Sequence, residues 1–346
     1  MSFRHTLLKE IYEQPLAIKD TIEKGMDKLD ELISIEHGEG PIIFLGMGSS
    51  YFASLYAKSL FSGQRGVCCD AVLASEYLYY PRNFDNKSLI IAISQSGESI
   101  ETVKAVKKMR SKRLRVWALT NSPGSTLAEL ANGVLLTYAG EERGSSTKTF
   151  VSTLALLNIF KFKRSTLADS SYSNMVAKMY DVSRFIRDQM DSWENDCCEM
   201  SKIVDGTNSI IILGRGYNYY TALQASLLFK EVSKIHAEAM SGGNFRHGPI
   251  ELVSPNLLTI SIAAGRTKSL SHKIIRDIKN LGGKCLLIAE GEERRSNEEI
   301  YFKKVDEALS PLLSIVPLQL LVYHSALRRG RDPDSPQYME KITTKE

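Results

Sequence analysis

The sequence contains few residues of the types that mark disulfide-rich or metal-binding proteins. Only 5 of its 346 residues are cysteines, and they form the pairs Cys68-Cys69 and Cys197-Cys198 and the single Cys285. There is no C-x-x-C pair and no histidine at the spacing of a metal ligand set. This cysteine usage indicates a reducing compartment and argues against a structural zinc site.

Long apolar runs are also absent from the sequence. No run approaches the roughly 18 apolar residues that a membrane-spanning helix needs, and the segment Met1 to His5 lacks the apolar core of a signal peptide. We therefore expect a cytoplasmic protein.

An excess of charge of one sign is missing as well, because the formal net charge is only +4. This charge is too small to favour nucleic acid or an anionic membrane as the main partner. One basic run, Lys104 to Arg115, is most simply the solvated face of a helix and its exit, because no aromatic residues alternate with its charges.

The sequence does have the composition of a soluble globular protein, with 43% apolar and 24% charged residues. A chain of 346 residues is long enough for two domains of ordinary size, each with its own core.

The first predicted strand is followed directly by a glycine loop and a helix. Ile42 to Leu45 is a short apolar run, Gly46-Met47-Gly48-Ser49-Ser50 is the loop, and helical periodicity resumes at Tyr51. This order places backbone N–H groups and a helix N-terminus at the carboxyl end of a strand, where they can bind an anion. The loop is not a full dinucleotide-binding fingerprint, because Tyr51 occupies the third glycine position.

A second unit of the same kind carries more polar groups. The apolar strand Ser88 to Ile93 leads into Ser94-Gln95-Ser96-Gly97-Glu98-Ser99 and then into a helix, Ile100 to Met109. Several hydroxyl groups and an amide beside a helix N-terminus can bind a phosphate without a metal. Helix capping would account for one of these serines but not for all of them, so we favour a phosphate site.

The remaining pattern of the first half predicts the fold class. Further strands are expected at residues 115–120 and 133–138, with helices between and after them. Alternating strands and helices predict an α/β fold with a doubly wound parallel sheet. Residues 6–36 have helical spacing interrupted by Pro15, which predicts a pair of N-terminal helices. The composition becomes polar at residues 165–174, where we expect a domain boundary.

The second half of the chain repeats the first half. Gly48 and Gly97 follow successive strands 49 residues apart, and Gly216 and Gly265 do so at the same distance. We interpret this as an internal duplication. In place of the serine loop the second copy has Ala263-Ala264-Gly265-Arg266-Thr267-Lys268. We therefore expect only the first copy to bind phosphate.

The segment Lys230 to Pro249 has no counterpart in the first copy and is rich in ionisable groups. Apolar residues at helical spacing from Ala222 to Leu228 place Glu231 toward the end of a buried helix. Burial raises the pKa of a carboxyl group, which suits proton transfer. His247 precedes the turn Gly248-Pro249 and is a candidate second acid or base. The alternative is structural, because a carboxylate near a helix end is more often a capping or solvated group.

Taken together, these motifs resemble the tandem sugar-isomerase (SIS) domains of glucosamine-6-phosphate synthase. The resemblance covers nearly the whole chain and is carried by Ser94–Ser99, Lys230–Ala239, Arg246–Pro249, Glu10–Pro15, Val316–Leu321, Asp332, Pro336 and Lys341. It implies two doubly wound, flavodoxin-like SIS domains in tandem. The expected segments are N-terminal helices at 1–38, a phosphate-binding domain at 39–164, a linker helix at 165–200, an acid–base domain at 201–330 and a tail over the active site at 331–346.

The resemblance also implies a site for a 6-phosphohexose that needs no metal and no cofactor. The matching phosphate-binding positions are Ser50, Ser94, Gln95, Ser96 and Ser99, and the matching sugar-binding positions are Gly48, Ser49, Ser145 and Ser146. Glu231 matches the glutamate that moves a proton between C1 and C2 of the sugar. His247 matches the ring-opening histidine, which the neighbouring subunit of a homodimer contributes. Lys341 matches the lysine that forms a Schiff base with the open-chain ketose.

The chain also departs from the synthase pattern. It has no N-terminal glutaminase domain and no N-terminal cysteine nucleophile, so we expect that it does not take ammonia from glutamine by itself. Leu228 and Gln337 stand where the synthase has a lysine and an arginine, and the loop at Gly144-Ser145 is shorter. We therefore expect a different amino-sugar substrate or a different reaction direction.

The leading hypothesis is an amino-sugar-phosphate deaminase with isomerase chemistry that converts glucosamine 6-phosphate to fructose 6-phosphate and ammonia. Two alternatives use the same groups: a fructosamine-6-phosphate deglycase and the isomerase subunit of a split glucosamine-6-phosphate synthase. A non-catalytic sugar-phosphate sensor is a further alternative, but a sensor does not need Glu231, His247 and Lys341 together. The expected partners are a phosphorylated sugar and a second copy of the chain.

Overall fold

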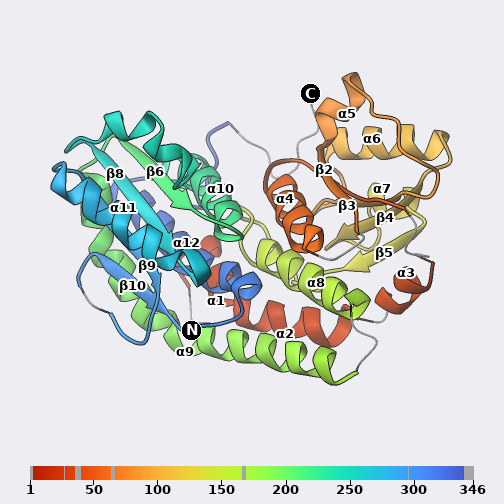
Figure 1. Ribbon diagram of the computed structural model, residues 1–346, viewed down its shortest axis with the longest axis horizontal. Coiled ribbons are helices and arrows are strands. Elements are labelled where there is room, and N and C mark those ends of the chain that lie inside the picture. The colour runs from red at the N-terminus through yellow and green to blue at the C-terminus, as the bar shows by residue number, and fades with distance from the viewer. Residues whose placement is uncertain are drawn as a thin grey trace. The chain divides into compact units, whose positions relative to one another are not determined.

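The computed structural model describes residues 3–26, 28–35, 40–63, 67–165, 169–294 and 296–338. Strands and helices alternate along the chain (Figure 1). The elements of the first half are α1 (Thr6–Tyr12), α2 (Gln14–Lys24), α3 (Leu29–Ile35), β1 (Ile42–Gly46), α4 (Gly48–Ser62), β2 (Cys69–Leu73), α5 (Ala74–Tyr79), β3 (Leu89–Ile93), α6 (Ile100–Ser111), β4 (Arg115–Thr120), α7 (Thr126–Leu130), β5 (Gly133–Leu136) and α8 (Lys148–Ser165). Those of the second half are α9 (Asp169–Asp205), β6 (Ser209–Gly214), α10 (Asn218–Leu228), β7 (His236–Ser241), β8 (Leu257–Ala263), α11 (Lys268–Asn280), β9 (Lys284–Glu290), β10 (Glu299–Phe302) and α12 (Ser310–Arg328).

The chain forms two compact units, each built around one five-stranded sheet. The β1–β5 unit comprises residues 13–142, 148–183 and 338–346, and the β6–β10 unit comprises residues 1–12, 143–147 and 184–337. The strand orders are β2-β1-β3-β4-β5 and β7-β6-β8-β9-β10, and all strand pairs are parallel. Two sheets with one order confirm the predicted doubly wound α/β fold.

Helices cover both faces of the β1–β5 sheet, which explains the continuous apolar runs of its strands. On one face Ile43 and Leu45 belong to a core that includes Val106 and Met109 of α6. On the other face three phenylalanine rings contact one another at tilted angles, Phe44 with Phe61 at 5.4 Å and Phe61 with Phe160 at 5.0 Å between ring centroids. These contacts join β1, α4 and α8.

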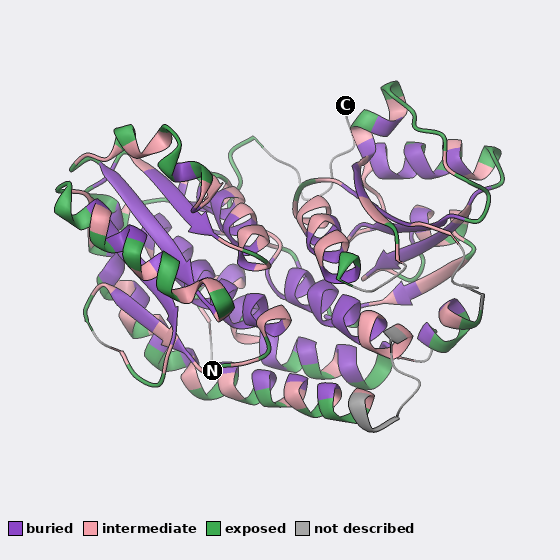
Figure 2. Cartoon of the chain, viewed as in Figure 1, coloured by how far each residue is buried: buried purple, intermediate pink, exposed green. Residues whose placement is uncertain are grey.

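In the β6–β10 unit the sheet packs on α11 through an apolar core, and Figure 2 shows β6 and β8 as largely buried. α10 and α12 pack against each other. Residues Glu307–Arg328 form the one described helix that is long and apolar enough to cross a membrane, but 89% of its most apolar window is buried within the structure. Such burial is expected of the core helix of a folded domain.

The duplication extends to backbone conformation. Gly48, Gly97, Gly216 and Gly265 have φ angles of 49°, 68°, 53° and 54°. Each stands in the loop after a strand, in the left-handed region that favours glycine. The two copies therefore use the same turn at the carboxyl ends of equivalent strands.

Four strands, β2, β7, β9 and β10, were not predicted from the sequence. β7 lies within the segment Lys230 to Pro249. β2 and β7 occupy equivalent edges of the two sheets. In β7 the exposed His236 and Glu238 alternate with Ala237, so the strand has few apolar side chains. Edge strands of this kind give a weak sequence signal, because one side of their backbone and much of their side-chain surface faces solvent.

One helical expectation needs correction. The N-terminal region forms three helices rather than two, and the first break falls at Glu13, because Pro15 is accommodated in the first turn of α2. The last helix, α12, contains Pro317, whose carbonyl accepts a hydrogen bond from the buried Cys197 thiol at 3.1 Å.

Candidate functional site

The structure brings two glycine- and serine-containing loops together at one point of the β1–β5 sheet. β1 and β3 are neighbours in the strand order, and α4 and α6 begin just beyond their carboxyl ends. The chain leaves these two strands in opposite directions, which makes this the topological switch point of the sheet. Ligands of doubly wound sheets bind in the crevice at this point. Gly48, Ser49 and Ser50 follow β1 on one side of this point, and residues 94–99 follow β3 on the other.

Neither helix is capped by the side chain of its N-cap residue. Met47 precedes α4 and Ser99 precedes α6, and neither side chain accepts a hydrogen bond from the helix. The first-turn N–H groups of two helices therefore point toward the switch point without a side-chain cap. Because such groups carry partial positive charge, the pair favours an anion such as phosphate.

The serine loop is held by hydrogen bonds within the β1–β5 unit. The Ser94 N–H donates to Leu119 O at 3.0 Å, and the Thr120 hydroxyl donates to Gln95 O at 3.1 Å. Within the loop Ser94 Oγ accepts from Gly97 N–H and Ser96 Oγ accepts from Glu98 N–H, each at 3.2 Å. Since a hydroxyl that accepts a bond still has its own proton to donate, both serines remain able to donate to a ligand.

Glycine is required at position 97 for two reasons. Its φ is +68°, and a Cβ atom there would lie 2.0 Å from Ser125 Oγ and 2.4 Å from Ser125 Cβ. Ser125 is itself fixed, because it caps α7 by accepting from Ala128 N–H. The close approach of Gly97 to Ser125 thus sets the path of the serine loop.

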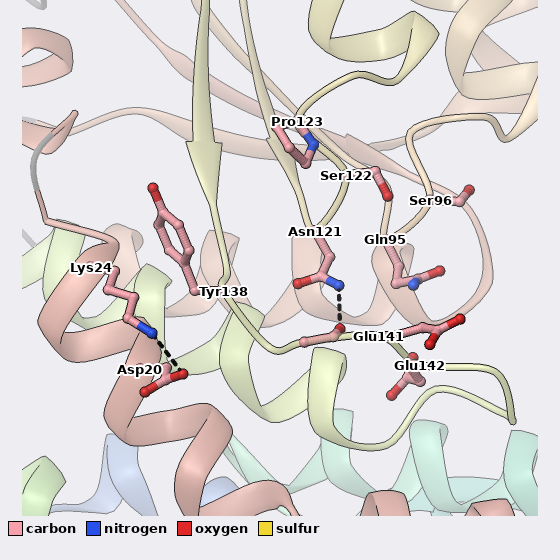
Figure 3. A pocket seen from close by; sticks show the side chains of 11 residues that line it. Asp20, Lys24, Gln95, Ser96, Asn121, Ser122, Pro123, Tyr138, Glu141 and Glu142 are labelled. Atoms are coloured by element: carbon pink, nitrogen blue, oxygen red, sulfur yellow. Dashed lines mark hydrogen bonds and ion pairs between the residues drawn. The ribbon is translucent and has the colours of Figure 1, made fainter.

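A cavity of about 640 Å³ opens beside this loop, and Figure 3 shows its lining. Gln95 and Ser96 lie on one side, and Tyr138, Lys24 and Asp20 lie on the other, with Lys24 Nζ 2.9 Å from the Asp20 carboxylate. The other lining residues are Asn121, Ser122, Pro123, Gly140, Glu141 and Glu142. Of the predicted phosphate-binding residues, only Gln95 and Ser96 reach this cavity.

Most of the cavity wall was not predicted as a site. Asn121 and Tyr138 follow β4 and β5, and the Asn121 amide donates to Gly140 O at 2.7 Å. Tyr138 is a non-glycine residue at φ 51°, a strained conformation that often occurs at functional positions. The available signal was the polar turn Asn121-Ser122-Pro123-Gly124 after a buried strand, since such turns share one edge of a parallel sheet.

Glu231 lies in the β6–β10 unit, near the end of a helix, as expected. The α-helical part, α10, ends at Leu228, and Glu231 stands in the π-helical turn Phe229–Ser233 that directly continues it. Lys234 at φ 55° ends the turn, and the Ser233 hydroxyl fixes it by donating to Val322 O of α12 at 2.8 Å. A π-turn rotates the following side chains around the helix axis and is frequent at functional sites. The sequence gives no period by which this turn could be predicted.

His247 lies beyond the carboxyl end of β7, in the same unit. β7 separates it from Glu231, and its six residues span about 17–20 Å. Glu231 precedes the start of β7, whereas His247 follows the end of β7, after a short 3₁₀ turn, Asn244–Arg246. His247 is exposed, and its backbone N–H donates to Asn244 O at 2.9 Å. Within this unit the two predicted acid–base residues therefore do not come together.

The predicted sugar loop, Ser145 and Ser146, belongs to the same compact unit as Glu231. Ser146 O accepts from the Gln224 amide of α10 at 3.0 Å. The buried Glu10 carboxylate of α1 accepts the Gly144 N–H at 3.1 Å and the Arg143 N–H. Two elements far apart in sequence thus hold this loop.

Two further predictions concern the C-terminal tail. Lys341 lies outside the described residues. The tail is fixed as far as Asp334, whose carboxylate accepts the Thr6 N–H at 2.6 Å and the Leu7 N–H at 2.8 Å at the start of α1. Gln337 is exposed. Within the described part of the chain, no group of at least three histidine, cysteine, aspartate or glutamate side chains is arranged to hold a metal ion.

Comparison with known proteins decides the family. The SIS domain family matches residues 37–161 and 204–329, one match for each half. The chain belongs to the SIS domain family. This result confirms the resemblance drawn from the sequence motifs, and the two SIS matches correspond to the two parallel sheets.

Curated SIS relatives match almost the whole chain. The glutamine–fructose-6-phosphate aminotransferase (isomerizing) of Thermococcus kodakarensis is 33% identical over 352 residues, and that of Pyrococcus horikoshii is 34% identical over 355 residues. Each alignment covers 99% of this chain but 58% of the relative. The chain therefore spans somewhat more than half the length of these relatives.

Solved SIS structures share the fold. The C-terminal domain of glucosamine-fructose-6-phosphate aminotransferase from Francisella tularensis superposes with a TM-score of 0.90 at 28% identity, covering 97% of this chain and 99% of that one. A glucosamine-6-phosphate deaminase from Thermotoga maritima superposes with a TM-score of 0.79 at 22% identity, covering 97% and 99%. At that identity the second likeness concerns the fold alone.

Proposed function

We propose that this SIS protein is an enzyme that releases the amine of an amino-hexose 6-phosphate. In its simplest form the reaction converts glucosamine 6-phosphate and water to fructose 6-phosphate and ammonia. The observation that carries the proposal is the serine loop at the switch point, where two helix N-termini lack side-chain caps. The printed names of the 33–34% identical relatives, which are fructose-6-phosphate aminotransferases, support a hexose 6-phosphate as the ligand.

In this proposal the first-half loops hold the substrate. Ser50, Ser94, Gln95, Ser96 and Ser99 bind the phosphate together with the helix N-termini. Gly48, Ser49, Ser145 and Ser146 contact the sugar. Hydrogen-bond donors and helix dipoles are sufficient to bind a phosphate dianion, so the site needs no metal.

The proposed chemistry is a proton transfer followed by hydrolysis. His247 assists opening of the sugar ring, which exposes the C1 aldehyde. Glu231 then removes the C2 proton and returns a proton to C1, so that the C2–N bond becomes an imine. Water adds to C2, the C–N bond breaks, and ammonia leaves with fructose 6-phosphate. Lys341 is proposed to form a Schiff base with the open-chain ketose.

We propose that the working protein is a homodimer whose active site uses His247 of the second copy. Support comes from the separation of Glu231 and His247 by the whole length of β7 in one sheet. Mixing a Glu231→Gln protein with a His247→Asn protein, each inactive alone, should restore activity through mixed dimers. Restoration that fails after verified subunit exchange would assign both residues to one chain.

Leu228 supports a substrate different from that of the synthase. Its side chain is 1% exposed, so the position that carries a lysine in the synthase is part of the apolar core here. A site with one cation fewer holds the sugar oxygens less tightly, which favours a different amino-sugar substrate. We also propose that the enzyme works in the cytoplasm, in keeping with five cysteines of which none forms a disulfide.

The test is incubation of the pure protein with glucosamine 6-phosphate while ammonia and fructose 6-phosphate are measured together. Equal release of both is expected. Lys230→Gln, which alters the exposed neighbour of Glu231, is the matched control and should retain activity.

A second candidate, cleavage of a fructosamine 6-phosphate, is favoured by one observation, the environment of Arg215.

A further inference from the structure

Arg215 is a partly buried arginine for which the described residues provide no acceptor. It stands between Gly214 and Gly216, just after β6. Its Nε atom is buried and has no hydrogen-bond partner, and no carboxylate of the described chain pairs with its guanidinium group. Since a buried donor without an acceptor is costly, such a group calls for a functional explanation.

The guanidinium lies flat against the loop that leads to His247. A Cβ atom at Gly242 would be 2.9 Å from Arg215 Nε, 3.2 Å from Cζ and 3.2 Å from Nη2, so a face of the group meets Gly242. A Cβ atom at Gly243 would lie 3.7 Å from Nη1. Because one face is covered by backbone, the in-plane N–H groups remain to bind a planar anion. The 3₁₀ turn between Gly243 and His247 advances only about 6 Å, so Arg215 and His247 share one neighbourhood.

The other arginines nearby have carboxylate partners. Arg246 pairs with Asp277 of α11, and Arg266 Nε lies 2.9 Å from the Glu307 carboxylate. Burial lowers the pKa of Arg215, and the like charge of the nearby Arg246 lowers it further. An added carboxylate would relieve the repulsion and satisfy the buried N–H together, in the bidentate geometry that arginine prefers.

We propose that Arg215 binds a carboxylate carried by the amine substituent of a further class of substrate for this site, the fructosamine 6-phosphates of amino acids. The proposal rests on the proposed function. In that scheme the serine loop takes the phosphate at C6, and His247 acts at the C1 end of the sugar. The hexose itself is neutral, so a second anion near His247 can only belong to the group attached through nitrogen.

The corresponding reaction uses the same proton transfer in the other sense. Glu231 removes a C1 proton and a proton is returned to C2, which converts the C1 amine and C2 ketone into a C1 imine and a C2 alcohol. Water adds to C1 and the C1–N bond breaks. The products are glucose 6-phosphate and the free amino acid, with no net oxidation or reduction.

The test compares two synthetic substrates that differ only in the carboxylate: the fructosamine 6-phosphates of glycine and of methylamine. Wild-type protein is expected to prefer the glycine conjugate by about 10- to 100-fold in kcat/KM, the range of a charge-assisted hydrogen bond. Arg215→Gln should remove this preference by lowering kcat/KM for the glycine conjugate alone, and Arg215→Lys should restore part of it. Arg266→Gln, an exposed and already paired arginine of the neighbouring loop, is the matched control and should keep the preference.

Two outcomes would overturn the proposal. One is equal kcat/KM for both conjugates in the wild-type protein. The other is an equal loss for both conjugates in Arg215→Gln, which would make Arg215 a positioning residue of the His247 loop. If no sugar phosphate is turned over, the proposed function fails, but the carboxylate site is still decided by calorimetric binding of the two conjugates. Equal affinities there, or a preference that Arg215→Gln leaves intact, would contradict it.

Discussion

The serine loop depends on Gly97, and Gly97→Ala is the substitution whose effect can be worked out most fully. An alanine at φ +68° costs about 1–2 kcal/mol in backbone conformation. Its Cβ would also overlap Ser125, at 2.0 Å from Oγ, and overpacking of this kind costs about 1–3 kcal/mol. We therefore expect a loss of about 2–5 kcal/mol in the free energy of unfolding, or a shift of the loop that relieves part of it.

Denaturant unfolding and binding of glucosamine 6-phosphate should be measured on the same preparations. Gly124→Ala is the matched control, because a Cβ atom there meets nothing within 4 Å. It should change the free energy of unfolding by less than about 0.5 kcal/mol. Gly97→Ala should lower stability, phosphosugar affinity or both. A Gly97→Ala protein as stable as Gly124→Ala and equal to wild type in affinity would refute the assigned loop geometry.

Three further predictions concern separate parts of the chain. Ser96→Ala combined with Ser99→Ala should weaken binding of phosphorylated sugars about 10-fold or more in a titration, because two donors are lost, and unchanged affinity would mean that the phosphate binds elsewhere. Leu228→Lys should lower the free energy of unfolding by about 2–4 kcal/mol, because a charge replaces a side chain that is 1% exposed. Leu227→Lys, at a half-buried position, is the control and should lower it less. Equal losses in the two variants would contradict the burial of Leu228. Burial lowers the pKa of His324 below its ordinary 6.5, so on acidification the unfolded chain binds the proton before the folded chain does. The free energy of unfolding should therefore fall as pH drops below about 6.5, and His324→Gln should flatten that part of the curve. An unchanged curve would contradict the lowered pKa of His324.

The sequence was sufficient to predict the fold class, because buried parallel strands are short apolar runs with glycine at their carboxyl ends. β1, β3 and β4 were predicted to within a residue or two, and β6 and β8 are the strands expected before Gly216 and Gly265. β2 and β7 were not, because edge strands carry polar side chains such as His236 and Glu238. The repeated glycine spacing predicted the duplication. The four glycines all have positive φ angles, which explains why glycine recurs at these positions.

The candidate site was predictable only in part. Motif spacing placed Gly48 and the serine loop on neighbouring strand ends, since strand order in a doubly wound sheet follows from the alternation of elements. It could not place Glu231 in a π-turn, because that turn arises from packing of Phe229 and Ser233 against α12 rather than from local periodicity. Nor could it show that Arg215 lacks an acceptor, because this depends on how the loop after β6 packs against Gly242 and Gly243, which follow β7.

The central claim is that Glu231 moves the proton that leads to amine release. It is tested most directly by parallel measurements of glucosamine 6-phosphate binding and of ammonia release for wild-type protein and Glu231→Gln. Because Glu231 belongs to the proton-transfer step and not to the phosphate site, both proteins should bind the sugar phosphate with similar affinity, and only the wild type should release ammonia and fructose 6-phosphate in equal amounts. Binding without turnover in the wild type, or undiminished release in Glu231→Gln, would contradict the account.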